Sequence, residues 1–308
     1  MAEAPAIQRF LDDLGRQRRA SPHTLAAYRR DLTKLEHLAA GRGPAQLHAH
    51  EIRSFVARLH AGGLSASTLA RMLSAWRSYF GWLTERGELS ANPVLGIRPP
   101  RRERRLPKAL SADQAVTLAA YVGDDSWLAL RDHAFIELLY SSGLRLSELV
   151  SLDWRYFAAE PGLAASSSWV DLDVGEATVL GKGSKTRTVP IGTHARGALA
   201  RWLENRSIAR ADPRALFLSA RGPRLTARSV QARLAQVARQ LGLGVHVHPH
   251  VLRHSFASHL LQSSGDLRAV QELLGHANIA TTQVYTRLDW QHLAKAYDAA
   301  HPRAKRRR

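Results

Sequence analysis

The chain has 308 residues, of which 45% are hydrophobic, and its 44 Lys and Arg against 26 Asp and Glu give a formal net charge of +18. This length suits two domains better than one. The positive excess predicts a polyanionic partner such as a nucleic acid. The absence of Cys excludes disulfides, thiolate catalysis and Cys-ligated metal. No stretch approaches 18 apolar residues and no signal-peptide core follows Met1, so we expect a cytoplasmic protein without a membrane partner.

Four apolar helical patterns predict an all-helical domain in residues 1–97. Ser21 and Pro22 are typical of the N-cap and first position of its second helix. We interpret the aromatic stripe of Trp76, Tyr79 and Phe80 as core rather than as a base-stacking surface. Arginines that either line a DNA face or are merely solvated are Arg16, Arg18, Arg19, Arg29, Arg30, Arg71 and Arg77.

Residues 98–108 are predicted to be an extended linker. They contain three prolines, which disfavour helix, and six basic residues against one acidic residue. We therefore place the domain boundary here, between residues 1–97 and residues 109–308.

The second domain is predicted to be mainly helical with a small β-sheet. Its predicted helices are 111–122, which opens with a capping box, then 128–140, 143–154, 195–205, 227–241 and one that begins at Pro249. Residues 176–180 and 186–191 read as two strands joined by a turn at 181–185. Residues 158–168 are rich in Ala, Ser, Gly and Pro and are typical of a surface loop.

The residues that carry chemistry gather near the C-terminus. His250 and Arg253 are spaced i, i+3, so a helix projects both from one face. Gly275 ends the next apolar pattern and leaves His276 at a helix end, and Tyr285 follows nine residues later. Imidazoles, a guanidinium and a phenol, with no carboxylate among them, suit the binding and attack of a phosphate.

A metal site is the competing interpretation of this histidine-rich stretch. His246, His248 and His250 alternate, and His250 and His254 have the i, i+4 spacing of a zinc helix. However, the chain contains no Cys, and the glutamate of an HExxH motif is absent here. We therefore predict no metal.

In order, the motifs Gly143-Leu-Arg145-Leu-Ser-Glu-Leu, His250-x-x-Arg253, Leu-Gly-His276 and Tyr285 resemble those of the tyrosine recombinases, the phage-integrase-like family. The resemblance runs over nearly the whole chain. It implies a helical, SAM-like core-binding domain and a catalytic domain that form a C-shaped clamp on DNA. The loop at 158–168 is longer than the corresponding part of the family.

The resemblance also implies the roles of the site residues. Tyr285 would attack DNA and form a 3′-phosphotyrosyl intermediate, without metal, cofactor or ATP. Arg145, Arg253 and His276 would stabilise the phosphate, Lys182 would protonate the leaving 5′ oxygen, and His250 would handle the tyrosyl proton. Lys185 is the competing candidate for the acid, and Glu148 either orients Arg145 or forms an ordinary surface pair with it.

The partners are implied by the same resemblance. They are a dif-like site in double-stranded DNA, a XerD-like recombinase in a heterotetrameric synapse, and an FtsK-like translocase, with the C-terminal tail docking between subunits. The alternatives are a phage, transposon or integron integrase, a type IB topoisomerase, and a DNA-binding protein without catalytic activity.

Overall fold

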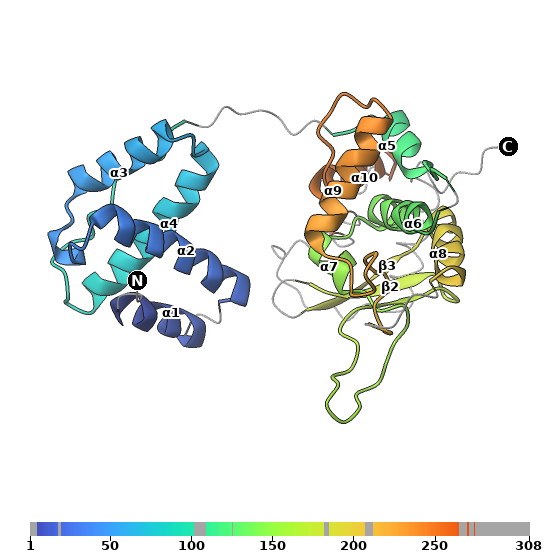
Figure 1. Cartoon of the computed structure of the whole chain (residues 1–308), viewed down its shortest axis with the longest axis horizontal. Coiled ribbons are helices and arrows are strands. Elements are labelled where there is room, and N and C mark those ends of the chain that lie inside the picture. The colour runs from blue at the N-terminus through green and yellow to red at the C-terminus, as the bar shows by residue number, and fades with distance from the viewer. Residues whose placement is uncertain are drawn as a thin grey trace. The chain divides into compact units, whose positions relative to one another are not determined.

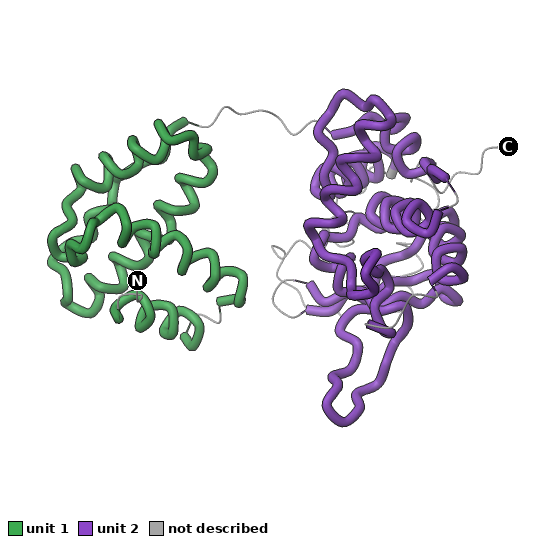
Figure 2. The backbone as a smooth tube through the Cα atoms, in the orientation of Figure 1, with its two compact units in different colours: residues 1–105 green, residues 106–308 purple. Residues whose placement is uncertain are grey.

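The computed structural model describes residues 5–17, 20–101, 109–124, 126–181, 185–206 and 212–264, together with Val270 and Leu274. The chain divides into two compact units, residues 1–105 and residues 106–308 (Figure 2). Each unit has its own hydrophobic core. No helix in the described part of the chain is long and apolar enough to cross a membrane.

The first unit is helical, and its helices begin where the sequence supplies caps. The described elements are α1 (Pro5–Gln17), α2 (Pro22–Ala39), a short 3-10 helix (Pro44–Gln46), α3 (Ala49–Ala61) and α4 (Ala66–Glu85). The Ser21 hydroxyl accepts a hydrogen bond from the Thr24 backbone N–H, and Ser65 caps α4 in the same way. Trp76, Tyr79 and Phe80 are at most 2% exposed, which confirms the stripe as core.

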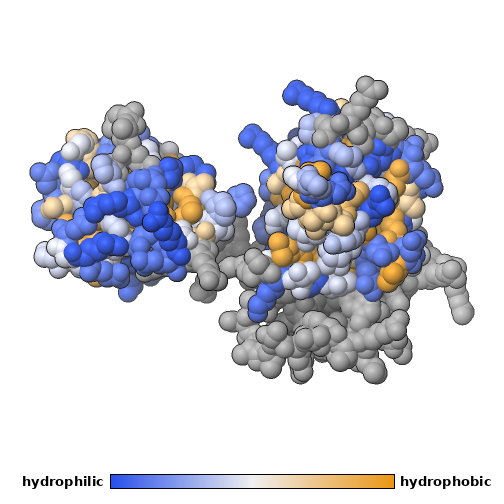
Figure 3. Space-filling view, turned by 90° about the horizontal axis from the view of Figure 1, so that it is seen from below, coloured by the Kyte–Doolittle hydropathy of each residue, from blue (hydrophilic) through white to orange (hydrophobic). Residues whose placement is uncertain are grey.

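Hydrophilic residues cover much of the face of the first unit that Figure 3 shows. Several predicted surface arginines make contacts within the unit. Arg71 pairs with the buried Asp31, and Arg77 donates to the Ile97 carbonyl over 3.0 Å. Arg18 and Arg19 lie outside the described residues.

The second unit is built around one buried helix. Its described helices are α5 (Ala112–Ala119), α6 (Trp127–Ser142), α7 (Leu146–Ser151), α8 (Thr193–Glu204), α9 (Ala227–Gln240) and α10 (Pro249–Ser264). Every residue of α6 from Arg131 to Ser142 is buried. The helix packs against α5, α8, α9 and α10 and against the sheet, so it connects most of the unit (Figure 1).

The sheet has three antiparallel strands in the order β1 (Trp169–Asp171), β2 (Glu176–Leu180) and β3 (Thr186–Pro190). The two longer strands confirm the predicted hairpin. The register pairs Val179 with Arg187 and Leu180 with Thr186. The sequence analysis missed β1, because three residues are too few for a periodic pattern to be recognised.

Two predicted helices are shorter than expected. The helix predicted for 111–122 ends at Ala119, and the one predicted for 143–154 spans only Leu146–Ser151. Arg145 consequently lies at the N-cap of α7 and not within a helix. The reason is local: Gly143 ends α6 at φ +57°, a left-handed conformation that interrupts the helix before Arg145.

The loop between α7 and β1 projects from the second unit as a finger (Figure 1), which we define as residues 156–168. The two arms of the loop meet where the Ser166 N–H donates to the Phe157 carbonyl over 2.9 Å. The Ser166 hydroxyl donates to Asp153 over 2.6 Å, and Arg214 donates to the Ala164 carbonyl over 2.9 Å. The base of the finger is therefore braced, while Leu163 at its tip is 54% exposed.

Candidate functional site

Glu148 lies at the centre of a charged cluster in the second unit. Its carboxylate accepts a hydrogen bond from the Arg145 backbone N–H over 2.7 Å and from Arg145 Nη1 over 2.8 Å. The first bond closes a capping box at the start of α7. The Glu148 side chain is 2% exposed and that of Arg145 is 29% exposed, so the interpretation of an ordinary surface pair is wrong.

Arg187 reaches the same carboxylate from β3. Its Nη1 donates to Glu148 Oε1 over 2.6 Å and its Nη2 to Oε2 over 2.8 Å. These two bonds form a bidentate ion pair, the geometry in which a guanidinium binds a carboxylate most strongly. The pair joins the start of α7 to the hairpin.

Burial of Glu148 by itself would raise the pKa of its carboxyl group. The hydrogen bonds and charge of Arg187, followed by the contacts of Arg145, outweigh this effect and lower the pKa to about 2. Glu148 is therefore an anion at neutral pH.

Arg253, on α10, is held by two main-chain carbonyl groups. Its Nη1 donates to the Gly143 carbonyl and its Nη2 to the Leu274 carbonyl. Gly143 lies two residues before Arg145, and Leu274 lies two residues before His276. A single guanidinium thus links three sequence motifs that are far apart in the chain.

Arg253 also lies in a strongly positive environment. Burial lowers the pKa of its guanidinium first, and the positive charge of Arg145 lowers it further, to about 10. It remains protonated at neutral pH, but its charge is only partly compensated by Glu148. Such a place favours a bound anion, because an anion would interact with Arg145 and Arg253 together.

His250 lies exposed in the first turn of α10. Its ring centroid is 6.0 Å from that of His248, which in turn is 5.7 Å from that of His246. Burial lowers the pKa of His248, with contributions from the other two rings. Within the ranges that the structure describes, no group of three or more His, Asp or Glu is placed to hold a metal ion.

His259 serves a different purpose from His250. Its Nε2 lies 3.0 Å from the Leu110 carbonyl, which can only accept, so Nε2 donates. Its Nδ1 then accepts from the Tyr140 hydroxyl over 3.0 Å. The ring is buried with both nitrogens used, and it connects α6 and α10 to the chain before α5.

Three predicted site residues, Lys182, His276 and Tyr285, lie outside the described residues. The residue before Lys182 is described, however. Gly181 donates to the Lys185 carbonyl over 2.8 Å, and a β-carbon at Gly181 would lie 3.4 Å from Arg187 Nη1 and 3.9 Å from Glu148 Oε1. The backbone that enters the turn therefore lies beside the charged cluster. Lys185 is exposed.

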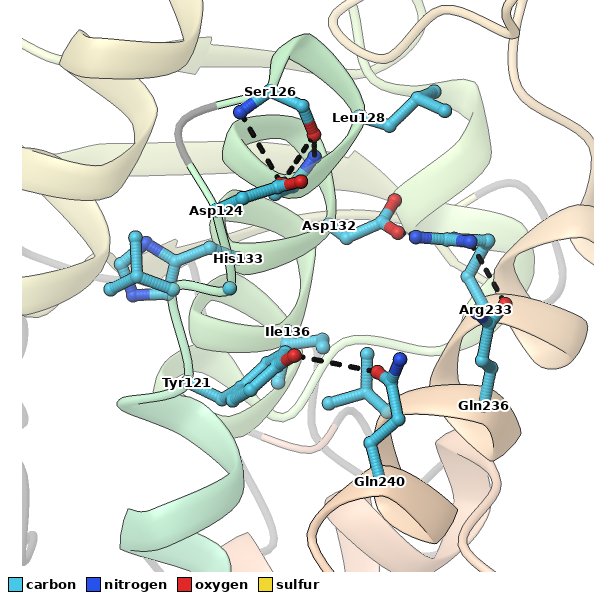
Figure 4. A pocket seen from close by; sticks show the side chains of 14 residues that line it. Tyr121, Asp124, Ser126, Leu128, Asp132, His133, Ile136, Arg233, Gln236 and Gln240 are labelled. Carbon is cyan, nitrogen blue, oxygen red and sulfur yellow. Dashed lines mark hydrogen bonds and ion pairs between the residues drawn. The ribbon is translucent and has the colours of Figure 1, made fainter.

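A cavity of about 470 Å³ lies elsewhere in the unit, beyond the end of α5 and against α6 and α9 (Figure 4). Its polar groups bind one another: Arg233 pairs with Asp132, and the Tyr121 hydroxyl donates to Gln240 over 3.4 Å. None of the arginines of the Glu148 cluster lines it. The charged cluster, and not this cavity, is the candidate site.

Arg187 is the one residue of this cluster that the sequence analysis missed. A signal was present, because Arg187 and Val189 are two residues apart in a strand and share a face. Val189 is fully buried, so the same face draws the Arg187 side chain inward, where a charge needs a partner. The identity of that partner could not be deduced from the alternation.

Comparison with known proteins identifies the two units. Residues 108–292 match the phage integrase family, and residues 7–87 match the phage integrase N-terminal SAM-like domain. The chain is 56% identical to tyrosine recombinase XerC 1 of Ralstonia nicotianae, over 98% of this chain and 95% of that protein. It is 49% identical to tyrosine recombinase XerC of Pseudomonas aeruginosa, over 98% of this chain and 96% of that protein.

Solved structures share the fold. The Tn1549 transposon integrase in complex with circular intermediate DNA superimposes with a TM-score of 0.68 at 19% identity, over 93% of this chain and 98% of that one. The XerH recombinase bound to a palindromic difH substrate gives 0.63 at 22% identity, over 94% and 83%. The expected fold class, mainly helical with a small sheet in two domains, is confirmed. The chain belongs to the phage integrase family and is a tyrosine recombinase, an enzyme that breaks and rejoins DNA.

Proposed function

We propose that this recombinase is of the XerC type and acts with a XerD-like recombinase on a dif-like site in double-stranded DNA. It would resolve chromosome dimers at cell division, in the cytoplasm, under the control of an FtsK-like translocase. The likeness to XerC proteins over nearly the full length supports this assignment. The observation that carries the chemistry is the meeting of Arg145 and Arg253 beside the buried Glu148.

The two arginines would hold the nonbridging oxygens of the scissile phosphate. A guanidinium stays protonated and matches two phosphate oxygens at once. Arg145 keeps part of its side chain exposed after binding Glu148, and Arg253 is oriented by the carbonyls of Gly143 and Leu274. Both are thus prepared before DNA arrives, which is the condition for effective stabilisation of a transition state.

In the proposed reaction, the Tyr285 phenol oxygen attacks the phosphorus and the bond from phosphorus to the 5′ oxygen breaks. His250 would accept the phenol proton, and Lys182 would donate a proton to the departing 5′ oxygen. His276 would donate to the charged phosphoryl oxygens. A 5′-hydroxyl from another strand reverses the step, so the bond energy is kept and neither ATP nor a metal is needed.

We propose the same division of labour for the domains. Residues 1–97 would bind the DNA core site, residues 98–108 would link the domains through their six basic side chains, and residues 109–308 would cut and rejoin. Closure of the two domains as a C-shaped clamp on DNA remains part of this proposal. The solved neighbours named above that are bound to DNA support a double-stranded substrate.

A nicked suicide substrate tests the chemistry. Wild-type protein should become covalently attached to the DNA, whereas Tyr285→Phe should bind the DNA with nearly unchanged affinity and form no adduct. Tyr297→Phe is the matched control and should form the adduct normally. Phosphotyrosine in the Tyr285→Phe variant would place the nucleophile elsewhere.

The partner is tested through the C-terminal tail, which lies outside the described residues. A chain that ends at Trp290 should retain single-site binding, with a weaker dependence on salt as basic contacts are lost. Its cooperative assembly with a XerD-like partner should fall much further, as measured by gel-shift titration. Unchanged cooperativity would leave the tail as a DNA contact only.

A further inference from the structure

The Glu148 carboxylate presents an electrostatic problem that Arg145 alone does not solve. The side chain is almost fully buried, and one buried anion with one cationic partner would hold that partner tightly. Arg145 would then be drawn onto the carboxylate by both of its guanidinium edges. A guanidinium used in this way has less of its charge and fewer N–H groups to offer to a phosphate.

Arg187 removes this constraint. It binds both Glu148 oxygens, Oε1 through Nη1 and Oε2 through Nη2, while Arg145 Nη1 donates to Oε1. The Arg187 side chain is 11% exposed against 29% for Arg145, so the two arginines approach the carboxylate from an inner and an outer position. Glu148, Arg145 and Arg187 together carry one net positive charge, and Arg145 is the more exposed of the two arginines.

The location of Arg187 adds a second effect. It lies on β3 directly across from Val179 on β2, and the backbone of Gly181 lies beside its guanidinium. Gly181 immediately precedes Lys182. The ion pair between Arg187 and Glu148 therefore ties the hairpin that carries the proposed acid to the start of α7, where Arg145 is capped.

We propose that Arg187 is a positioning residue, which balances the buried Glu148 carboxylate, so that Glu148 does not neutralise the positive charge that Arg145 presents to the scissile phosphate. Arg187 itself does not contact the phosphate in this scheme. The inference deepens the proposed function and depends on it. Arg187 acts through Glu148, so its effect on cleavage depends on whether residue 148 carries a charge.

The test is a double-mutant cycle on the full-length protein, read out as the single-turnover rate of covalent attachment to the suicide substrate. Arg187→Met keeps an unbranched apolar stem and removes the charge and the N–H groups, and should slow attachment by roughly 10²-fold, the lower end of what loss of one transition-state donor produces. Glu148→Gln should also slow the wild-type enzyme, because Arg145 loses its ionic anchor. In the Arg187→Met background, however, Glu148→Gln should raise the rate, because it removes the unbalanced carboxylate.

Arg187→Lys provides a second measurement, which is useful if Arg187→Met folds poorly. It keeps the charge and loses the bidentate geometry, so its rate should fall between those of wild type and Arg187→Met. Arg196→Met is the matched control: Arg196 donates to the Leu172 carbonyl over 2.8 Å, away from Glu148, and its loss should leave the rate unchanged. Rates are compared per folded molecule, with folding followed by circular dichroism, and DNA affinity is measured for each variant.

The results separate the inference from the proposed function. If wild type forms no covalent complex, the proposed function fails. If wild type reacts but Glu148→Gln slows Arg187→Met as much as it slows wild type, then Arg187 does not act through the charge of Glu148 and the inference is wrong. The inference is equally wrong if Arg187→Met reacts at the wild-type rate, or if Arg187→Lys is no faster than Arg187→Met.

Discussion

Gly143 is the position where a single added methyl group should do most harm. It ends α6 with φ +57°, a left-handed conformation that costs a residue with a β-carbon about 1–2 kcal/mol. A β-carbon there would also overlap the Phe256 ring, lying 2.7 Å from Cε1. Phe256 is 1% exposed and has little room to move, so this overlap adds about 1–3 kcal/mol. Gly143→Ala should therefore destabilise the second unit by about 2–5 kcal/mol.

Gly242 is the matched control. It follows α9 with φ +61°, and nothing lies within 4 Å of a β-carbon placed on it. Gly242→Ala should cost only the backbone contribution of about 1–2 kcal/mol. The difference between the two variants isolates the overlap with Phe256.

Hydrogen exchange of the α6 amides, measured by mass spectrometry, reports the stability of the second unit without interference from the first. Equal losses of protection in Gly143→Ala and Gly242→Ala would refute the packing argument. In a Phe256→Leu background the additional penalty at Gly143 should shrink, because the overlapping ring atoms are gone. Gly143→Ala should also slow covalent attachment to DNA, since the Gly143 carbonyl positions Arg253.

Three further results are expected. The pKa of Glu148 is about 2 against an ordinary 4.5, so its ionised form contributes on the order of 3 kcal/mol to the free energy of unfolding above about pH 4.5, and this contribution is lost as the pH falls towards 2. In Glu148→Gln the free energy of unfolding should therefore fall less steeply with pH in this range, and an unchanged slope would contradict the assignment. The Lys182→Ala variant should cleave ordinary DNA slowly, but its cleavage rate should recover on a 5′-phosphorothiolate substrate, because the sulfur leaves without an acid. If the rate of Lys185→Ala recovers in this way and that of Lys182→Ala does not, Lys185 is the acid. Replacement of residues 159–163 in the finger by a short Gly-Ser link should leave both folding and cleavage intact, because the contacts of Phe157, Ala164 and Ser166 remain; a loss of thermal stability would show that the tip packs on the unit.

The elements with strong local signals could be predicted from the sequence. Ser21 before Pro22 and the capping box at Ser111 begin helices where expected. The pattern in residues 176–180 and 186–191 predicted the hairpin, whose strands are Glu176–Leu180 and Thr186–Pro190. These signals act within one turn or one strand, so they are readable without knowledge of the fold. The resemblance of the motifs to those of the family likewise predicted that Arg145 and Arg253 belong to one active site.

Only the tertiary structure decided how the charges are arranged. Glu148 and Arg187 are 39 residues apart in the chain, and Arg253 and Gly143 are 110 apart. Helical spacing could suggest that Glu148 lies near Arg145, but it could not tell that the carboxylate is buried and bound by Arg187, because Arg187 lies on a strand far along the chain. The chain contains 44 basic residues, and no local pattern distinguishes the few that share a carboxylate or a carbonyl. Their selection depends on contacts between distant segments, which form only when the sheet and α10 meet α6 and α7.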